Sequence, residues 1–95
     1  MIDRWPHLRA LIRAASRVPS LELWLFGSAL RLPEPRDLDI LAVYDDRGAL
    51  LALRSSDAWD RYHPPIDLIA MTRLEVVEYD FVAVTGAVRL DVPPP

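Results

Sequence analysis

The sequence has no cysteine among its 95 residues. Disulfides, thiolate metal sites and cysteine nucleophiles are therefore excluded. It has only two histidines, His7 and His63, too few for a histidine-rich metal cage or an HExxH zinc helix. His7 is expected at the surface of a helix and His63 in a loop. The three glycines cannot form a GxGxxG or GxxxxGK(S/T) phosphate loop.

Lysine is also absent, and the 11 arginines are outnumbered by 14 acidic residues, which gives a net charge of −3. This balance argues against general nucleic-acid binding. No apolar run approaches the roughly 18 residues of a membrane span. The first 17 residues carry charges as far as Arg17 and have no apolar core typical of a signal peptide. We therefore expect a cytoplasmic protein without a membrane segment.

The apolar content, 52%, is high for a small domain and is enough to leave apolar surface for a partner. Turn residues and apolar periodicity predict a single domain over residues 1–95. We expect helices over 3–17, 49–62 and 73–85, and strands over 21–26, 37–44, 66–71 and 87–92. This order predicts an α/β (α+β) fold with a small mixed β-sheet and helices packed on one side.

Local signals refine these elements. The strand over 37–44 is apolar on both faces, which indicates a central position in the sheet. Asp3 is the expected N-cap of the first helix. Thr72 and Glu75 have the spacing of a capping box, and Gly86 suits the position after the last helix.

Three carboxylates lie at the expected starts of strands. Asp37 and Asp39 are two residues apart on an extended chain, so their side chains leave the same face. Asp67 has the equivalent place on the third strand, and the three converge if these strands are neighbours. Two carboxylates about 5 Å apart repel by roughly 3 kcal/mol at an effective dielectric near 20, and a hard divalent cation such as Mg²⁺ reverses that sign. Each feature alone is more typical of a solvated strand start or a turn; their combination favours chemistry.

The combination resembles a known family. Phe26-Gly27-Ser28, then Asp37-Leu38-Asp39-Ile40, then Ile66-Asp67-Leu68 is similar to the pattern of the minimal nucleotidyltransferases (MNT), a branch of the DNA polymerase beta-like nucleotidyltransferase superfamily. The resemblance extends over nearly the whole chain. It implies a nucleotidyltransferase-like fold.

The resemblance also implies roles for individual residues. Asp37 and Asp39 would bind Mg²⁺ that bridges the phosphates of a nucleoside triphosphate, with ATP as the default. Asp67 would help to bind a second metal ion or deprotonate the attacking hydroxyl. Gly27 would let the backbone approach the triphosphate, Ser28 would bond a phosphate oxygen, and Arg31 is a candidate phosphate contact. Asp37, Asp39 and Asp67 are thus the expected catalytic and metal residues.

The chain departs from the family pattern in three places. Eight residues separate Ser28 from Asp37, about two fewer than the usual loop. Leu30-Arg31-Leu32 replaces the common Ala-Arg-Gly. Arg36 places a cation beside the expected metal site, where a small or acidic residue is usual.

We expect a Mg²⁺-dependent transferase that moves AMP from ATP to a hydroxyl brought by a partner. The resemblance implies a tyrosine of a helical HEPN-type toxin as acceptor, with this chain as antitoxin; a homo-oligomer is the other expected assembly. The alternative is a catalytically inactive module of the same fold that binds and neutralises a basic protein.

Overall fold

A computed structural model describes residues 4–18, 20–55 and 62–90. Helices and strands alternate through much of it. In chain order they are α1 (Pro6–Ser16), β1 (Glu22–Phe26), the 3-10 helix η2 (Gly27–Leu30), β2 (Leu38–Tyr44), α2 (Arg47–Ser55), β3 (Ile66–Thr72), α3 (Arg73–Glu78), α4 (Phe81–Thr85) and β4 (Val88–Arg89). None of the helices in these ranges is long and apolar enough to cross a bilayer.

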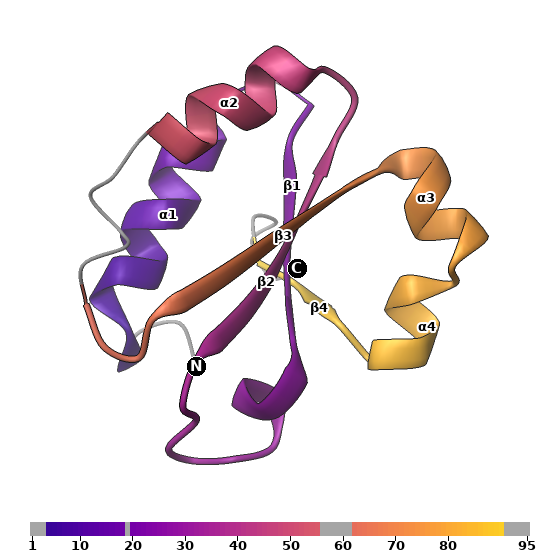
Figure 1. Ribbon diagram of the computed structural model, residues 1–95. Coiled ribbons are helices and arrows are strands. Elements are labelled where there is room, and N and C mark those ends of the chain that lie inside the picture. The colour runs from indigo at the N-terminus through magenta and orange to yellow at the C-terminus, as the bar shows by residue number, and fades with distance from the viewer. Residues whose placement is uncertain (1–3, 19, 56–61, 91–95) are drawn as a thin grey trace, which may run out of the picture.

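The four strands form one sheet in the order β3-β2-β1-β4 (Figure 1). Strand β2 runs antiparallel to β1 and parallel to β3, and β4 adds an antiparallel pair to the other edge of β1. The sheet is therefore mixed, and the α+β class predicted from the sequence is confirmed. The predicted central position of β2 is also confirmed.

The core lies between the sheet and helices α1 and α2. Alternate residues of β1 and β2 point to this face and are buried there against apolar residues of the two helices. The core includes Leu23, Leu25, Leu38 and Ile40 from the strands with Leu8, Leu11 and Leu53 from the helices. Leu41 and Val43 point to the opposite face of β2 and are also buried, because β2 is covered on both faces.

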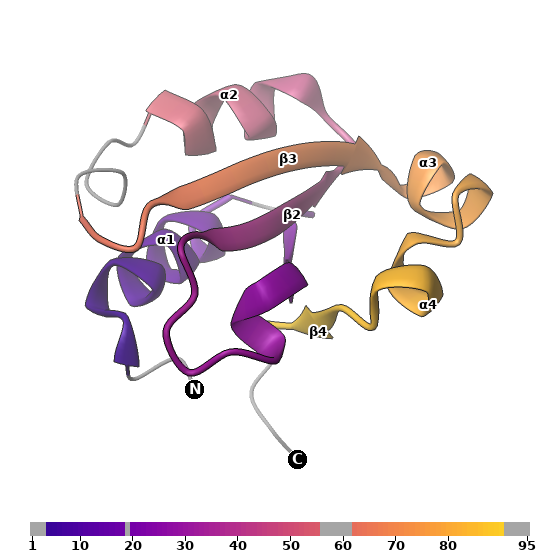
Figure 2. The same cartoon turned by 60° about the horizontal axis from the view of Figure 1, so that its bottom comes forward.

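The helices divide between the two faces of the sheet. Helices α1 and α2 lie on the core face, as expected, whereas α3 and α4 lie on the other side, so not all helices pack on one side (Figures 1 and 2). Phe26 of β1 points to that other face, and its ring meets Phe81 of α4 edge-on at a centroid distance of 4.9 Å. This contact holds α4 beside the end of β1. No residue of α3 or α4 is buried.

The single helix predicted over 73–85 is wrong, because two short helices occupy this range. The chain turns at Tyr79 and Asp80, and Asp80 adopts the left-handed conformation with φ of 50°. The predicted capping box is confirmed: the Glu75 amide donates to the Thr72 hydroxyl, and the Thr72 amide donates to the Glu75 carboxylate. Gly86 ends α4 with φ of 68°, as its position in the sequence predicted.

Two other helix boundaries differ from the prediction. Trp5 is the N-cap of α1 and its side chain makes no capping hydrogen bond, whereas the predicted cap, Asp3, lies outside the described residues. Pro6 begins the helix instead, where its fixed φ fits the first turn. Helix α2 starts at Arg47, two residues earlier than expected, and the part of the predicted helix over 56–61 lies outside the described residues.

The expected exposure of His7 is wrong, because this residue is only 4% exposed. Its Nε2–H donates to the Pro64 carbonyl oxygen at 2.7 Å. One residue further on, the Pro65 carbonyl accepts the Leu38 amide at 2.9 Å. The segment before β3 is thus tied both to α1 and to the start of β2, which aligns the first residues of the two parallel strands.

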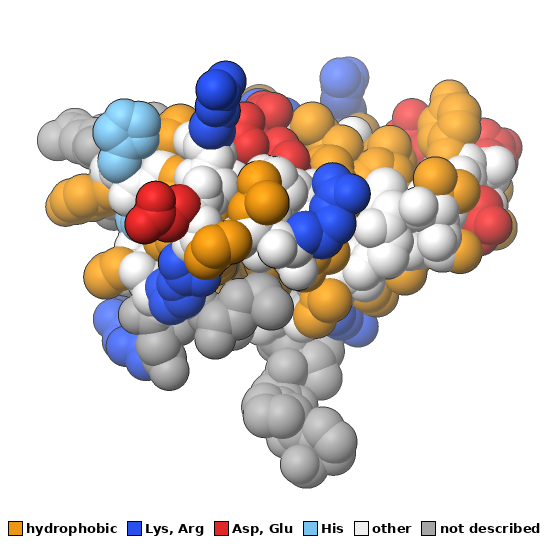
Figure 3. All heavy atoms as spheres, turned by 90° about the horizontal axis from the view of Figure 1, so that it is seen from below, with side chains coloured by type: hydrophobic (Ala, Val, Ile, Leu, Met, Phe, Trp, Pro, Cys, Tyr) orange, Lys and Arg blue, Asp and Glu red, His pale blue; other side chains and the backbone are white. Residues whose placement is uncertain are grey.

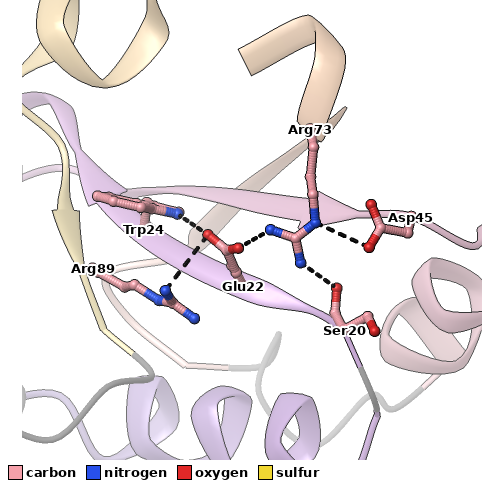
Figure 4. Close-up of polar contacts among 6 residues, drawn as sticks. All are labelled: Ser20, Glu22, Trp24, Asp45, Arg73 and Arg89. Carbon is pink, nitrogen blue, oxygen red and sulfur yellow. Dashed lines mark hydrogen bonds and ion pairs between the residues drawn. The ribbon is translucent and has the colours of Figure 1, made fainter. Parts of the chain in front are cut away.

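An arginine at the junction of β3 and α3 joins segments far apart in the sequence (Figure 4). The Arg73 guanidinium donates to Asp45 at 2.9 Å, to the Ser20 carbonyl at 3.3 Å and to Glu22 of β1. Glu22 also lies 3.9 Å from Arg89 of β4. The hydrogen bonds that Arg73 donates to Asp45 and Glu22 raise the pKa of Arg73, so its guanidinium stays charged. These contacts join the start of β1, the segment after β2, the start of α3 and strand β4.

Candidate functional site

The pairing of β2 with β3 brings three carboxylates together. In the parallel register Asp39 faces Asp67, and Asp37 lies just before the first residue of β2, Leu38. One carboxylate oxygen from each of Asp37, Asp39 and Asp67 lies within 4.8 Å of the other two. The convergence predicted from the sequence is present. We call these three residues the carboxylate triad.

Electrostatic repulsion within the triad is visible at Asp39. Burial raises the pKa of its carboxyl, and the negative charges of Asp37 and Asp67 raise it further. Asp37 and Asp39 are half-buried and Asp67 is exposed, so the triad forms a rim open to solvent. Like charges held this close favour either a shared proton or a bound cation. Only oxygen atoms are offered, and oxygen is the ligand that Mg²⁺ and other hard cations prefer. The donor set therefore fits such an ion.

Gly27 approaches the triad closely. It follows the last residue of β1, Phe26, which pairs with Asp39, and it has φ of 79°. A Cβ atom at this position would lie 2.1 Å from Asp39 Oδ2. Any other residue would therefore both strain the backbone and displace the carboxylate. The contact with Asp39 is closer than sequence alone could predict.

The predicted Gly-Ser turn is the short helix η2, which lies below β2 and beside β4 in Figure 2. The Ser28 carbonyl accepts the amides of Arg31 and Leu32, at 3.0 and 2.8 Å, and so closes the turn. Arg31 is exposed, and within the described ranges its side chain makes no hydrogen bond or ion pair. This free guanidinium is available to an anion.

A cavity of about 330 Å³ adjoins the triad through Gly27. It lies between η2 and α4 and contains two of the predicted nucleotide residues, Gly27 and Arg31, but not Ser28. The remaining lining residues are Phe26 and Leu30 on one side and Val84 and Thr85 on the other. The sequence analysis missed Val84 and Thr85. No local signal could have found them, because α4 reaches the cavity only through the turn at Tyr79 and Asp80.

Figure 3 looks at this end of the molecule, from below in the orientation of Figure 1. Acidic side chains gather beside hydrophobic surface, and arginine side chains lie around them. The arrangement is suited to a ligand that carries a cation, a polyanion and an apolar group.

No family model, no curated protein and no solved structure matches this chain. The functional interpretation therefore rests on the residues of the site and their geometry.

Proposed function

We propose that this chain is a Mg²⁺-dependent nucleotidyltransferase. The observation that carries the proposal is the carboxylate triad, whose oxygens lie within 4.8 Å of one another beside a glycine that permits close approach. The order of Gly27-Ser28, the Asp37 and Asp39 pair and Asp67 along the chain resembles that of the minimal nucleotidyltransferases, with a loop before Asp37 about two residues shorter. The open rim and the adjoining cavity support a nucleoside triphosphate as substrate.

Asp37 and Asp39 would hold the ion that also binds the triphosphate, and Asp67 would hold a second ion or accept the proton of the attacking hydroxyl. Bound divalent cations supply charge neutralisation at the phosphates and at the leaving group. In the proposed transfer a bond forms between the acceptor oxygen and the α-phosphorus. The bond from that phosphorus to the bridging oxygen breaks, and pyrophosphate leaves. Ser28 of η2 and Arg31, the residue that follows this helix, would contact phosphate oxygens.

The acceptor would be a hydroxyl carried by a partner protein, with a tyrosine of a HEPN-type toxin as the candidate that the family resemblance suggests. Exposed apolar residues on α3 and α4 support a protein-binding surface on this side of the molecule. Leu74, Val77, Tyr79 and Val84 are each more than 60% exposed. A second copy of this chain is the other occupant to test.

Calorimetric titration with ATP, with and without Mg²⁺, tests the nucleotide site. Asp39→Asn removes one charge of the triad with little change in shape, and Glu78→Gln makes the matched change at an exposed position of α3. We expect Mg²⁺-dependent binding by the wild type and by Glu78→Gln, and a loss of about tenfold or more in Asp39→Asn, since a charged ligand contributes about 1.5–3 kcal/mol.

Transfer of labelled AMP to a co-expressed partner then tests the reaction. Label on the partner with wild type and none with Asp39→Asn would support the transferase. A stable complex without any transfer would contradict it and favour the inactive binding module. Binding or transfer that is unchanged in Asp39→Asn would overturn the assignment of the triad.

A further inference from the structure

Strand β3 forms one edge of the sheet and is long and largely apolar. It has seven residues, whereas β4, at the opposite edge, has two. Asp67 is its one charged residue, and the strand contains neither lysine nor proline. In Figure 1 β3 passes in front of β2, and no helix or other strand is drawn in front of it. Natural sheets protect long edges with charged residues, prolines or bulges, because unpaired backbone groups bind other strands.

The backbone groups on the outer side of β3 are open to such a strand. The Pro65 carbonyl accepts the Leu38 amide, so Pro65 and every second residue after it point their amides and carbonyls toward β2. The residues between them, Ile66, Leu68 and Ala70, point these groups outward. Within residues 4–18, 20–55 and 62–90, no group forms a hydrogen bond to Leu68 or Ala70 on this outer side.

A second copy of this chain offers a strand that matches these groups. In an antiparallel pair with its two-fold axis at Ile69, the middle of β3, the whole strand is paired. Leu68 then lies opposite Ala70 of the second copy, and the two residues exchange hydrogen bonds through their outward groups. The pairing therefore satisfies the open backbone groups of both copies.

The charges also favour an axis at Ile69. In this register Asp67 lies opposite Met71 of the second copy, and the two Asp67 residues are offset by about 13 Å along the strands. An axis at Leu68 would place the two Asp67 residues diagonally adjacent, about 7–8 Å apart, and would bring two carboxylate triads together. Repulsion between the triads therefore selects the register centred on Ile69.

Side chains on the outer part of β3 complete the match. Ile69 and Met71 lie on the same face of the sheet as Leu41 and Val43 of β2 but keep part of their surface exposed, whereas Leu41 and Val43 are buried. At the axis Ile69 meets Ile69 of the second copy in a pair without hydrogen bonds, the pair type in which side chains lie closest. The second copy thus covers apolar surface that the single chain leaves open.

We propose that β3 pairs antiparallel with β3 of a second copy about an axis at Ile69, which joins the two sheets into one. This dimer does not depend on the proposed transferase activity. Sedimentation equilibrium of the full chain, without nucleotide or divalent cation, tests it. We expect a monomer–dimer equilibrium that shifts with protein concentration. A monomer at every concentration would overturn the proposal.

Variants of β3 test whether this strand is the interface. Ala70→Pro removes an outward amide but no hydrogen bond to β2, a position at which an edge strand accepts proline. We expect it to weaken the dimer about tenfold or more, since each dimer loses two hydrogen bonds. Ala70→Gly keeps the amide and is the matched control, expected to stay within about threefold of the wild type.

Ile69→Lys is a second disruptive variant and places like charges opposite each other at the axis. Circular dichroism and urea unfolding show which variants are folded. A folded Ala70→Pro or Ile69→Lys variant that forms dimers as tightly as the wild type would overturn β3 as the interface.

Charge variants of Met71 test the register. Met71→Lys places a cation opposite Asp67 of the second copy, and Met71→Glu places an anion there. We expect the first to strengthen the dimer about threefold and the second to weaken it by a similar factor. Val77→Lys and Val77→Glu make the same changes at an exposed position of α3 and are expected to leave the dimer unchanged. Equal effects of the two Met71 variants would overturn the register.

Discussion

Gly27 and Asp39 show how closely single residues define the candidate site. The glycine leaves β1 in a left-handed conformation and so makes room for the Asp39 carboxylate on β2. Gly86 has a similar φ of 68° at the end of α4, but a Cβ there would meet no atom within 4 Å. A substitution at Gly86 therefore costs only the free energy of the left-handed backbone, whereas one at Gly27 costs that free energy and the steric clash with Asp39.

Gly27→Ala is therefore expected to destabilise the fold more than Gly86→Ala does. For Gly86→Ala the left-handed backbone alone costs about 1–2 kcal/mol. For Gly27→Ala the clash with Asp39 adds to this, and we expect a total of about 3 kcal/mol or more. Urea unfolding of both variants measures the difference. Equal losses would show that Asp39 moves aside freely and that its position is not constrained by Gly27.

At the scale of elements, the turn from β3 into α3 depends on local hydrogen bonds. The capping box between Thr72 and Glu75 starts α3. Arg73, the first residue of this helix, donates hydrogen bonds to Asp45 and Glu22 (Figure 4). Since α3 has only six residues and no buried side chain, tertiary packing contributes little to it. The cap is the main local stabilisation of its first turn.

Thr72→Ala should thus destabilise the protein by about 1 kcal/mol, the usual cost of losing an N-cap hydroxyl. Thr72→Ser keeps the hydroxyl and is expected to retain most of the stability. Chemical denaturation of the two variants beside the wild type gives both values. A serine variant as unstable as the alanine variant would mean that the methyl group of Thr72, rather than its hydroxyl, stabilises this junction.

At the scale of the whole molecule, negative charge is in excess, with a net charge of −3, and three of the acidic groups lie in one triad. The pKa of Asp39 lies above the ordinary aspartate value of 3.8, mainly through burial and then through Asp37 and Asp67. Between that value and the raised one, the folded protein binds more protons than the unfolded chain. The contribution of Asp39 to stability is therefore complete below pH 3.8 and falls as the pH rises through its raised pKa.

In buffer free of divalent cations, Asp39→Asn should gain stability relative to the wild type as the pH rises from acid to neutral. The gain is expected to be on the order of 1 kcal/mol, because solvent screens much of the repulsion. That is about 4–8 °C in Tm for a domain of this size. Glu78→Gln, at an exposed site, serves as the control and is expected to show no such trend. Added Mg²⁺ should stabilise the wild type and remove the advantage of Asp39→Asn.

A difference between Asp39→Asn and the wild type that does not depend on pH would contradict this account of the triad. Loss of the pH dependence on addition of Mg²⁺ would support a cation at the three carboxylates, because a bound cation offsets their repulsion.

The order of elements and the α+β class could be predicted from the sequence because they depend on local patterns. Apolar residues on both faces identified β2 as a central strand, and the spacing of Thr72 and Glu75 identified a helix start. The common side of Asp37 and Asp39 follows from the two-residue period of a strand. Each of these signals lies within a few residues along the chain.

What only the tertiary structure decided depends on contacts between distant segments. The parallel register of β2 and β3 places Asp67 against Asp39, and the antiparallel register of β1 and β2 brings Gly27 to the same carboxylate. The turn at Asp80 and the contact of Phe81 with Phe26 bring α4 to the cavity. These positions follow from strand pairing and side-chain packing across the whole molecule, which no short stretch of sequence specifies.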